Sequence, residues 1–247
     1  MNPIDILIKY WGHTKFRSKQ ELIIDNVLNQ KDVLALLPTG GGKSVCYQIP
    51  ALIKEGVCIV ISPLISLMQD QVKHLKSKGI KSVSISSSMS YSQTDTALTN
   101  CIYGGIKFLF LSPEKLKNNL IISRIKEMTI NLIAIDEAHC ISEWGHNFRP
   151  AYRKISEFRE ILPDVSILAL TATANSNVID DIQKTLKFNS SNIIKSSLIR
   201  PKLSYVVDDI IDKRKRLIKL LNKIKSSVII YVDTRRKSEE ISLYLNN

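Results

Sequence analysis

Short apolar runs alternate along most of the chain with longer segments in which apolar residues recur at helical spacing. A continuous apolar run of about four to eight residues is typical of a strand that is buried on both faces. Strands that alternate with helices in this way predict an α/β fold, with a parallel sheet, right-handed crossovers and helices on its faces. The runs that predict strands occupy residues 33–37, 57–61, 107–111, 131–135 and 165–170.

Helical periodicity fills most of the intervals between these runs. Ser18, with Glu21 three residues later, has the spacing of a capping box and predicts that a helix begins at Ser18. Residues 86–104 are polar and rich in Ser, Thr and Asn, so one helix is expected there, with no chemistry that we can assign. Further helices are expected after Pro63 and at residues 3–10, 45–56, 115–126 and 153–162.

The pattern changes after Ile193. Residues 196–210 resemble an extended linker, and residues 213–225 have the pattern of a basic amphipathic helix. A strand at 226–234 and a helix from 235 are expected to follow, but one strand cannot bury both its faces, and a second domain would need on the order of 100 more residues. We therefore expect a first domain at residues 1–199. Residues 200–247 would hold a linker and the incomplete start of a second α/β domain.

Charge is the first compositional feature that adds to this picture. The 247 residues carry a net charge of +12. Residues 200–247 hold 12 Lys and Arg against 6 Asp and Glu, and the rest of the chain holds 23 against 17, so each part contributes +6. A basic surface of this size favours an anionic polymer as partner. A solvated surface in a lysine-rich proteome explains the charge equally well, and composition alone leaves both open.

Hydropathy and cysteine spacing bound the cellular context. No apolar run approaches the roughly 18 to 20 residues that a membrane span needs, and the N-terminal residues show no signal peptide. The four cysteines lie far apart with no CxxC pair, which argues against a zinc site and against a disulfide framework. We expect a cytoplasmic protein, associated with the nucleoid if it is bacterial, with no membrane partner and no zinc.

A glycine-rich turn, PTGGGKS, follows the first apolar run at residues 38–44. A strand, a glycine turn and a helix together form a cradle in which backbone N–H groups and the helix N-terminus bind phosphates. The strict pattern GxxxxGK[ST] fails because Leu37 stands where its first glycine would be. Lys43 is expected to reach the β- and γ-phosphates of ATP, and Ser44 to ligate Mg²⁺. The candidate nucleotide-binding residues here are Thr39, Gly40, Gly41, Gly42, Lys43 and Ser44.

Two consecutive carboxylates, Asp136 and Glu137, follow the apolar run at residues 131–135. The C-terminal end of a parallel strand is where α/β folds place metal and phosphate chemistry. Asp136 is expected to hold Mg²⁺, and Glu137 to polarise the attacking water as general base. Two surface carboxylates in a turn are the alternative, which the glycine loop upstream disfavours.

Six segments of the chain stand in an order that is known from one helicase family. They are residues 16–20 (FRSKQ), 36–52, 61–72, 111–116 (LSPEKL), 135–152 and 169–174 (ALTATA). Together they resemble the first motor domain of RecQ-family DNA helicases, in superfamily 2. The patterns PTGGGKSxCYQ and DEAHCISxWGHxFRPxY are the most specific, because DEAD-box RNA helicases share only their generic positions. The resemblance implies a RecA-like P-loop NTPase domain and the beginning of a second one.

This resemblance implies further residues at the ATP site. Phe16, Arg17 and Gln20 correspond to the motif that reads adenine, and the Gln20 amide can pair with adenine N6 and N7. His13 stands where many family members carry a tyrosine that stacks on the base. His139 is expected to join Lys43, Asp136 and Glu137 in the catalytic group, through hydrogen-bonded relays.

The aromatic-rich loop at residues 142–149 corresponds to the family's sensor of single-stranded DNA, which signals to the ATP site. Trp144 and Phe148 suit stacking on bases, worth about 1–3 kcal/mol per base, and Arg149 suits pairing with phosphate. Packing of Trp144 and Phe148 on the domain's own core is the alternative. Thr173 is expected to contact the strand backbone or to couple the two sites, as are two serines of the DNA-binding set. That set is Ser62, Ser112, Trp144, His146, Phe148 and Arg149.

The activity implied by the resemblance is that of an ATP-dependent DNA helicase. It would move 3′ to 5′ on single-stranded DNA and unwind branched or duplex DNA, in DNA repair and recombination. The family's second motor domain supplies an arginine finger, worth about 10³–10⁵ in rate in comparable NTPases, and nothing in residues 200–247 matches its motif. We therefore expect weak ATP binding, slow hydrolysis and no unwinding by this chain alone. The alternative is a module that binds nucleotide or single-stranded DNA without turnover; the aromatic loop disfavours a P-loop kinase and an RNA helicase.

Overall fold

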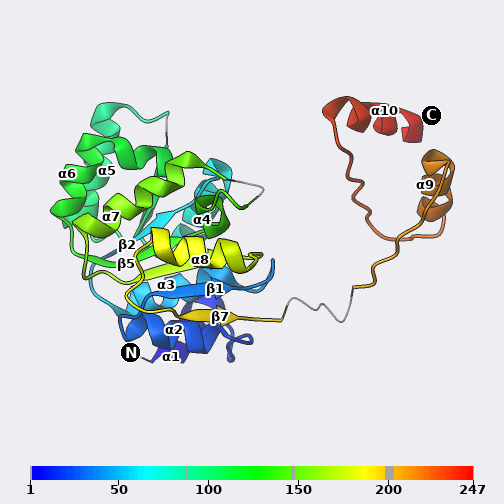
Figure 1. The fold of residues 1–247 in the computed structure, drawn as a ribbon. Helices are drawn as coiled ribbons and strands as arrows, with labels where there is room; N and C mark the ends of the chain where they lie inside the picture. The colour runs from blue at the N-terminus through cyan, green and yellow to red at the C-terminus, as the bar shows by residue number, and fades with distance from the viewer. Residues whose placement is uncertain (1, 87, 146–147, 198–202, 247) are drawn as a thin grey trace. The chain divides into compact units, whose positions relative to one another are not determined.

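The structure is a computed structural model that describes residues 2–86, 88–145, 148–197 and 203–246. The chain divides into two compact units, Met1–Leu198 and Ile199–Asn247, and each is described by itself (Figure 1). None of the helices in the described part of the chain has the length and apolar content that a membrane span needs.

The first unit is built on a sheet of seven strands in the described residues, and every neighbouring pair runs parallel. The order across the sheet is β3-β4-β2-β5-β6-β1-β7. This architecture confirms the predicted parallel α/β fold. The strands are β1 (Val33–Leu36), β2 (Val57–Ile61), β3 (Ser82–Ile85), β4 (Phe108–Leu111), β5 (Ile130–Ile135), β6 (Ile167–Thr171) and β7 (Ile193–Lys195).

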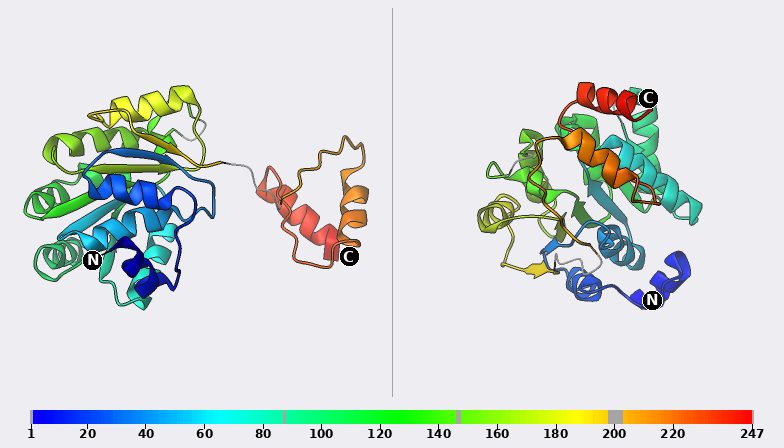
Figure 2. Two further views of the ribbon diagram at one scale, coloured as in Figure 1. Left: turned by 90° about the horizontal axis from the view of Figure 1, so that it is seen from below. Right: turned by 90° about the vertical axis from the view of Figure 1, so that its right-hand side faces the viewer.

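Helices cover both faces of this sheet, as the two views of Figure 2 show. Helices α2, α3 and α4 pack on one face with α1 outside them, and α5, α6, α7 and α8 pack on the other. The helices are α1 (Pro3–Trp11), α2 (Gln20–Leu28), α3 (Lys43–Ile53), α4 (Ile65–Ser77), α5 (Tyr91–Tyr103), α6 (Asn119–Lys126), α7 (Ile155–Ile161) and α8 (Ser176–Thr185).

Alternate side chains of each central strand enter two separate apolar cores. In β1, Leu34 and Leu36 pack with the helices of one face, whereas Val33 and Ala35 pack with those of the other. Because both faces are covered, every position of such a strand is apolar, and the strand is visible in the sequence as a continuous run.

Several elements differ from the prediction. Strands β3 and β7 and helix α8 were not expected. The segments expected as single helices at 115–126 and 153–162 are each split by a 3₁₀ turn, η1 (Pro113–Lys117) before α6 and η3 (Pro150–Lys154) before α7.

The capping box at Ser18 and Glu21 is wrong. Helix α2 begins at Gln20 after Lys19, and no side chain caps it. Ser18 has a positive φ of 32°, and its hydroxyl lies 3.1 Å from that of Ser196 beside β7. A contact distant in sequence thus replaces the local cap.

The second unit contains helices α9 (Lys213–Leu221) and α10 (Arg235–Asn246), and neither helix buries a residue. The predicted strand at residues 226–234 is wrong, because the described residues there have no strand conformation. Its apolar side chains stay in solvent, with Ile229 77% and Tyr231 89% exposed. Without a neighbouring strand, an apolar run has nothing to pair with. That this unit begins a second RecA-like domain stays a prediction.

Candidate active site

The polar loops of the first unit meet because the strands before them are neighbours. Strands β2, β5, β6 and β1 lie side by side and parallel, so their C-terminal ends share one edge of the sheet. Two backbone hydrogen bonds continue this pairing beyond the strands: Asp136 N–H donates to Ile61 O at 2.8 Å, and Leu37 N–H to Thr171 O at 3.0 Å. The glycine loop and the paired carboxylates therefore face a common space, as predicted.

The glycine loop has the left-handed backbone that its composition predicts. Gly40 and Gly42 have φ values of 78° and 77°, which a residue with a Cβ adopts only with strain. Gly42 is the N-cap of α3, so the free N–H groups of the helix open next to the loop. Lys43 and Ser44 are the first residues of that helix, where dipole and donors favour a bound anion.

Gln20 holds the glycine loop from the side. Its carboxamide nitrogen donates to Gly42 O at 3.0 Å and to Gly41 O at 3.3 Å, and its oxygen accepts from Arg17 N–H at 2.8 Å. Arg17 adds a bond from its guanidinium to Gly40 O at 2.9 Å. A Cβ on Gly42 would lie 2.3 Å from the Gln20 amide nitrogen, so the Gln20 side chain would have to shift away from the loop.

These contacts change the interpretation of the predicted adenine motif. Gln20 is 4% exposed, so it is neither a solvated surface residue nor free to pair with a base without leaving the loop. Phe16 packs beside the core cluster of α1, α2 and α3, whereas His13 is exposed. The adenine contacts of Phe16, Arg17, Gln20 and His13 stay predictions. Thr39 lies in the exposed part of the loop.

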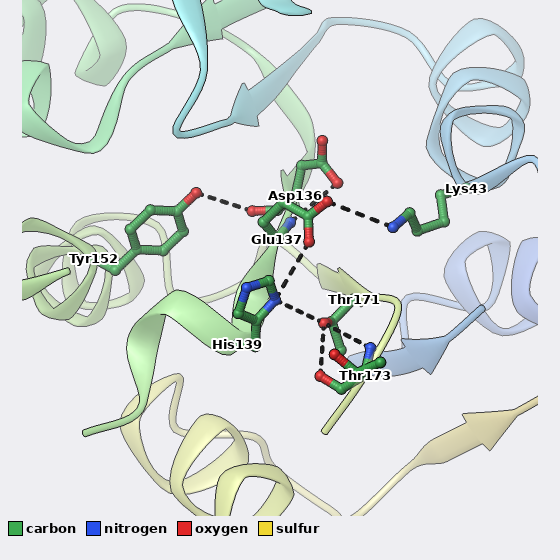
Figure 3. Close-up of polar contacts among 7 residues, drawn as sticks. All are labelled: Lys43, Asp136, Glu137, His139, Tyr152, Thr171 and Thr173. Carbon is green, nitrogen blue, oxygen red and sulfur yellow. Dashed lines mark hydrogen bonds and ion pairs between the residues drawn. The ribbon is translucent and has the colours of Figure 1, made fainter. Parts of the chain in front are cut away.

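A chain of polar contacts runs from the glycine loop across the sheet edge (Figure 3). The Lys43 ammonium lies 3.6 Å from one oxygen of Glu137, and the other oxygen lies 3.3 Å from His139 Nδ1. His139 Nδ1 also lies 2.9 Å from the hydroxyl of Thr171, which donates to Thr173 O at 3.1 Å. Because the single hydroxyl proton of Thr171 goes to Thr173, the proton between His139 and Thr171 belongs to Nδ1. The sequence motifs named four members of this chain, and Thr171 was not singled out.

Burial sets the charge states in this cluster. Desolvation raises the pKa of Asp136, the neighbouring Glu137 carboxylate raises it further, and Lys43 opposes both. Desolvation lowers the pKa of His139 below its ordinary value, and Lys43 acts in the same direction against the raising effect of Glu137. The imidazole is therefore neutral at pH 7 and protonated at Nδ1.

The surroundings of Asp136 fit a divalent cation. Among the described residues, its carboxylate receives a single hydrogen bond, from Glu137 N–H at 3.0 Å, and forms no ion pair. The described residues hold no group of three or more His, Cys, Asp or Glu that could bind a metal alone. A cation held by Asp136 and Ser44 would need further oxygen ligands from phosphate and water, which is how Mg²⁺ is bound in nucleotide sites.

The aromatic loop begins after the 3₁₀ turn η2 (Ala138–Ile141). Trp144 is 70% exposed, so the alternative that it packs on the core is wrong. Phe148 is partly buried, with the Arg153 guanidinium 5.6 Å from its ring centroid. His146 lies outside the described residues. An exposed indole fits the predicted stacking role, which stays a prediction.

The loop returns to the carboxylates through Arg149 and Tyr152. Arg149 N–H donates to Cys140 O at 2.9 Å, and its guanidinium donates to Pro63 O at 3.1 Å. The fully buried Tyr152 donates its hydroxyl proton to Asp136 O at 3.0 Å (Figure 3). Arg149, expected to bind phosphate, is thus engaged with the protein, and its phosphate contact stays a prediction. Sequence reasoning missed Tyr152, whose only signal was its place in the motif FRPAY.

Ser62 and Ser112 follow strands β2 and β4, which are neighbours in the sheet. The Ser62 hydroxyl is buried and has no hydrogen-bond partner among the described residues. Ser112 precedes η1 and borders a cavity of about 380 Å³ together with Ile65, Ile85 and Lys115. A buried hydroxyl without a partner is compatible with a ligand contact, but the DNA role of both serines stays a prediction.

Comparison with known proteins gives this geometry a context. Residues 17–182 match the DEAD/DEAH box helicase family. The chain is 39% identical over 239 residues to the probable ATP-dependent DNA helicase RecS of Bacillus subtilis, covering 96% of this chain and 48% of that protein. It is 40% identical over 246 residues to the ATP-dependent DNA helicase RecQ of Haemophilus influenzae, covering 99% and 40%.

One relative carries a different description: the putative ATP-dependent RNA helicase R290 of Acanthamoeba polyphaga mimivirus, 42% identical over 245 residues, covering 96% of this chain and 44% of that protein. The chain thus spans about half or less of the length of these relatives.

Solved structures agree on the fold. The DUF1998 helicase MrfA has a TM-score of 0.72 at 17% identity, covering 99% of this chain and 40% of that chain. A hypothetical ATP-dependent RNA helicase from Sulfolobus tokodaii has a TM-score of 0.63 at 21% identity, covering 99% and 72%. The parallel sheet flanked by helices is therefore the predicted RecA-like helicase fold.

Proposed function

The chain belongs to the DEAD/DEAH box helicase family, and from that premise we propose that its first unit binds ATP with Mg²⁺ and hydrolyses it in response to single-stranded DNA. The observation that carries this proposal is the continuous line of contacts from Lys43 through Glu137 and His139 to Thr171, next to the free N-terminus of α3. Each strand end on this line supplies one part of a nucleotide site.

The residues divide the chemistry between them. Lys43 would leave Glu137 for the β- and γ-phosphates, which frees Glu137 to take a proton from the attacking water. The Nδ1–H of the neutral His139 would donate to Thr171, which would hold the ring beside the Glu137 carboxylate. Ser44 and Asp136 would hold Mg²⁺, which supplies neutralisation of the phosphate charge when it is bound.

The aromatic loop is proposed to report DNA to this site through Arg149 and Tyr152. A base stacked on Trp144 would shift the loop. Arg149 at the end of the loop donates to Pro63 O, and Tyr152 shortly after it donates to Asp136 O. Moving the Asp136 carbonyl would move the carboxylate of the same residue. Coupling through these two hydrogen bonds adds a second route to the η2 turn, which joins the carboxylates to the loop directly.

Translocation from 3′ to 5′ and unwinding of branched or duplex DNA are proposed for the whole motor, in DNA repair and recombination. The resemblance to RecQ-family helicases implies them, and this chain spans half or less of the DNA helicases RecS and RecQ that it matches. For these 247 residues we propose weak ATP binding, slow hydrolysis and no unwinding, in the cytoplasm at the nucleoid if the protein is bacterial.

The test compares Lys43→Ala and Trp144→Ala in nucleotide binding and in ATPase activity with single-stranded DNA or RNA. Lys43→Ala is expected to weaken binding of a fluorescent ATP analogue at least tenfold, about 1.4 kcal/mol. Trp144→Ala should leave that affinity unchanged and abolish the response to DNA. Lys73→Ala and Tyr91→Ala are matched controls, because both residues are exposed and lie in other parts of the unit. Equal loss of both properties in both variants would refute this division, and equal stimulation by RNA would refute the DNA assignment.

Tyr152→Phe tests the coupling route. It removes one hydroxyl from a buried site, and an unsatisfied buried carbonyl costs about 1–3 kcal/mol. We expect the ATP affinity to stay within about twofold of wild type, a change in binding free energy of less than about 0.5 kcal/mol. The Mg²⁺ concentration required should rise, and the response to DNA should weaken. Tyr103→Phe, at an exposed tyrosine of the same unit, is the control. An unchanged Mg²⁺ titration together with full DNA stimulation would rule the route out.

The second candidate function is nucleotide and DNA binding without turnover. It is favoured by the Lys43–Glu137 ion pair, which occupies both the phosphate-binding cation and the proposed base. Phosphate release over many enzyme equivalents of ATP separates the candidates: binding without release supports the second, and any DNA-stimulated release supports the first.

A further inference from the structure

A four-residue turn at residues 17–20 holds the glycine loop with its two end residues and contacts the end of strand β7 through its tip. The turn is closed by Gln20 N–H, which donates to Arg17 O at 2.9 Å. The side chains of Arg17 and Gln20 donate to three carbonyls of the glycine loop. The shape of the loop therefore depends on the position of this turn.

The carbonyls that accept from the turn determine where the N–H groups of the glycine loop point. In a trans peptide unit the C=O and the N–H point in opposite directions. Because Gly41 O and Gly42 O are directed towards Gln20, the N–H groups of Gly42 and Lys43 are directed away from it. Phosphate binds to N–H groups that are presented in this way at a helix N-terminus. Displacement of the turn would thus change the orientation of the phosphate donors.

Ser18, at the tip of the turn, has a strained backbone. Its φ of 32° is left-handed, a conformation that a residue with a Cβ adopts only at a cost in free energy. Such a conformation persists only where the surrounding structure holds it. Among the described residues, the Ser18 hydroxyl contacts the hydroxyl of Ser196, 3.1 Å away. This serine contact is in a position to hold the strained tip.

Ser196 is itself fixed to the strand that leads into the glycine loop. It follows β7 directly, and its N–H donates to Leu36 O at 2.9 Å, at the end of β1. The first unit ends two residues later, at Leu198. Ser196 thus joins the end of β1, the tip of the turn and the segment that continues to the second unit.

We propose that Ser196 is a positioning residue for nucleotide binding, which acts by holding Ser18 and thereby the turn at residues 17–20. While the serine contact is present, Arg17 and Gln20 stay on the loop carbonyls and the phosphate donors stay aligned. Without it, Ser18 relaxes its φ and the turn shifts. By thermodynamic reciprocity, a nucleotide on the loop also holds Ser196 and the chain that leaves the first unit there. This inference rests on the proposed binding of ATP at the glycine loop.

The first test is a double-mutant cycle in the 247-residue chain, measured as the Kd of a fluorescent ATP analogue with Mg²⁺. Ser18→Ala and Ser196→Ala should each weaken binding about threefold, the size of effect expected for one hydrogen bond. The double variant should bind no more weakly than either single variant, because one contact needs both hydroxyls. Ser196→Thr, which keeps a hydroxyl, should bind within about twofold of wild type.

The matched control is Ser190→Ala, at an exposed serine three residues before β7. It should leave the Kd unchanged, and thermal melting of every variant verifies that it folds. Additive losses in the double variant, a loss of the same size in Ser190→Ala, or no recovery in Ser196→Thr would each overturn the proposal, since each would separate the effect from the serine contact.

Hydrogen exchange without nucleotide tests the same contact independently of ATP. Amides of residues 39–44 should exchange roughly threefold faster in Ser196→Ala than in wild type or Ser190→Ala, because the loop opens more often when the turn is released. Adding the ATP analogue should protect residues 193–197 in wild type and protect them less in Ser18→Ala.

The two measurements separate this inference from the proposed function. If wild type and Lys43→Ala bind the analogue equally, the proposed ATP site fails, and faster loop exchange in Ser196→Ala still supports the positioning role. If the analogue binds in a Lys43-dependent way while Ser196→Ala changes neither the Kd nor the loop exchange, the ATP site stands and the role of Ser196 is refuted.

Discussion

Two apolar runs of this chain have nearly the same sequence pattern and opposite fates. Residues 57–61 (VCIVI) form β2, where no side chain is more than 3% exposed. Residues 228–232 (VIIYV) have no strand conformation, and Tyr231 is almost fully exposed. The difference is in the neighbours: β2 has β4 on one side and β5 on the other, with helices on both faces.

An apolar run forms a buried strand only where the rest of the chain supplies neighbouring strands and helices that cover both faces. In the first unit, the 50 or more residues on either side of β2 supply these strands and helices. In the second unit, residues 203–246 supply two helices and bury nothing. We therefore expect the stability of the chain to reside in the first unit, and matched substitutions in the two units should show it.

The largest difference is expected between two Arg–Asp pairs of similar geometry. Arg159 Nη2 lies 2.8 Å from the buried Asp32, just before β1 in the first unit. Arg216 Nη2 lies 2.6 Å from Asp208 at the surface of the second unit. Asp32→Ala leaves a buried guanidinium without its partner, which costs about 3–5 kcal/mol. Asp208→Ala breaks an exposed pair worth about 0–1 kcal/mol. Urea unfolding measures both.

Asp32 does more than pair with Arg159, and this adds to the expected loss. Its carboxylate also accepts from Ile167 N–H at 2.9 Å, and its carbonyl accepts from Asn192 at 2.9 Å, so it joins the starts of β1, β6 and β7. Asp32→Asn, which keeps the shape and loses the charge, should fall between wild type and the alanine variant. A loss below about 1 kcal/mol for Asp32→Ala would contradict the assigned role.

The apolar runs themselves give the next comparison. Ile133→Ala in the fully buried β5 should cost about 2–5 kcal/mol, from lost transfer energy and a cavity. Ile230→Ala in the second unit should change the free energy of unfolding by less than about 0.5 kcal/mol, because exposed positions contribute little. Chemical denaturation of both variants decides it, and similar losses would show that the second unit has a core of its own.

The sequence predicted the central strands and not the edges, and burial explains both results. Strands β1, β2, β4, β5 and β6 are covered on both faces, so each is a continuous apolar run. Among the described strands, β3 (SVSI) pairs with β4 alone, and it alternates serine with apolar residues in four positions, too few for a clear pattern. Strand β7 has three residues, and its pairing with β1 has no local signal.

In the candidate site, sequence motifs identified the residues, and the contacts in the structure changed the roles expected of Gln20 and Arg149. Lys43, Glu137 and His139 come together because each lies in a segment that follows the C-terminal end of a strand, β1 or β5, which the sequence order already indicates. Gln20 and Arg149 could not be assigned in this way. The two carbonyls that accept from the Gln20 amide lie 21 and 22 residues away, and the acceptor of the Arg149 guanidinium lies 86 residues away. A local pattern contains no information on such contacts.

The smallest effects on stability are expected from substitutions of two aspartates whose pKa values are shifted in opposite directions. Burial raises the pKa of Asp136, and Glu137 adds to this rise. A hydrogen bond from Lys237 lowers the pKa of the exposed Asp233. A carboxyl whose folded pKa is raised destabilises the folded state above that pKa, and this cost disappears as the pH falls through it towards the unfolded value.

Asp136→Asn should therefore raise the melting temperature at pH 7 by a small amount, on the order of 2 °C, when Mg²⁺ is absent. The gain should shrink as the pH falls towards 4, because wild-type Asp136 then becomes protonated and neutral as well. Asp233→Asn should have the opposite sign, with any loss present at pH 7 and removed in acid. Adding Mg²⁺ and ATP should stabilise wild type more than Asp136→Asn, since a ligand stabilises the state that binds it. If Asp136→Asn is less stable than wild type at pH 7 without Mg²⁺, the carboxylate stabilises the folded state, and the proposed role in cation binding does not explain its place in the site.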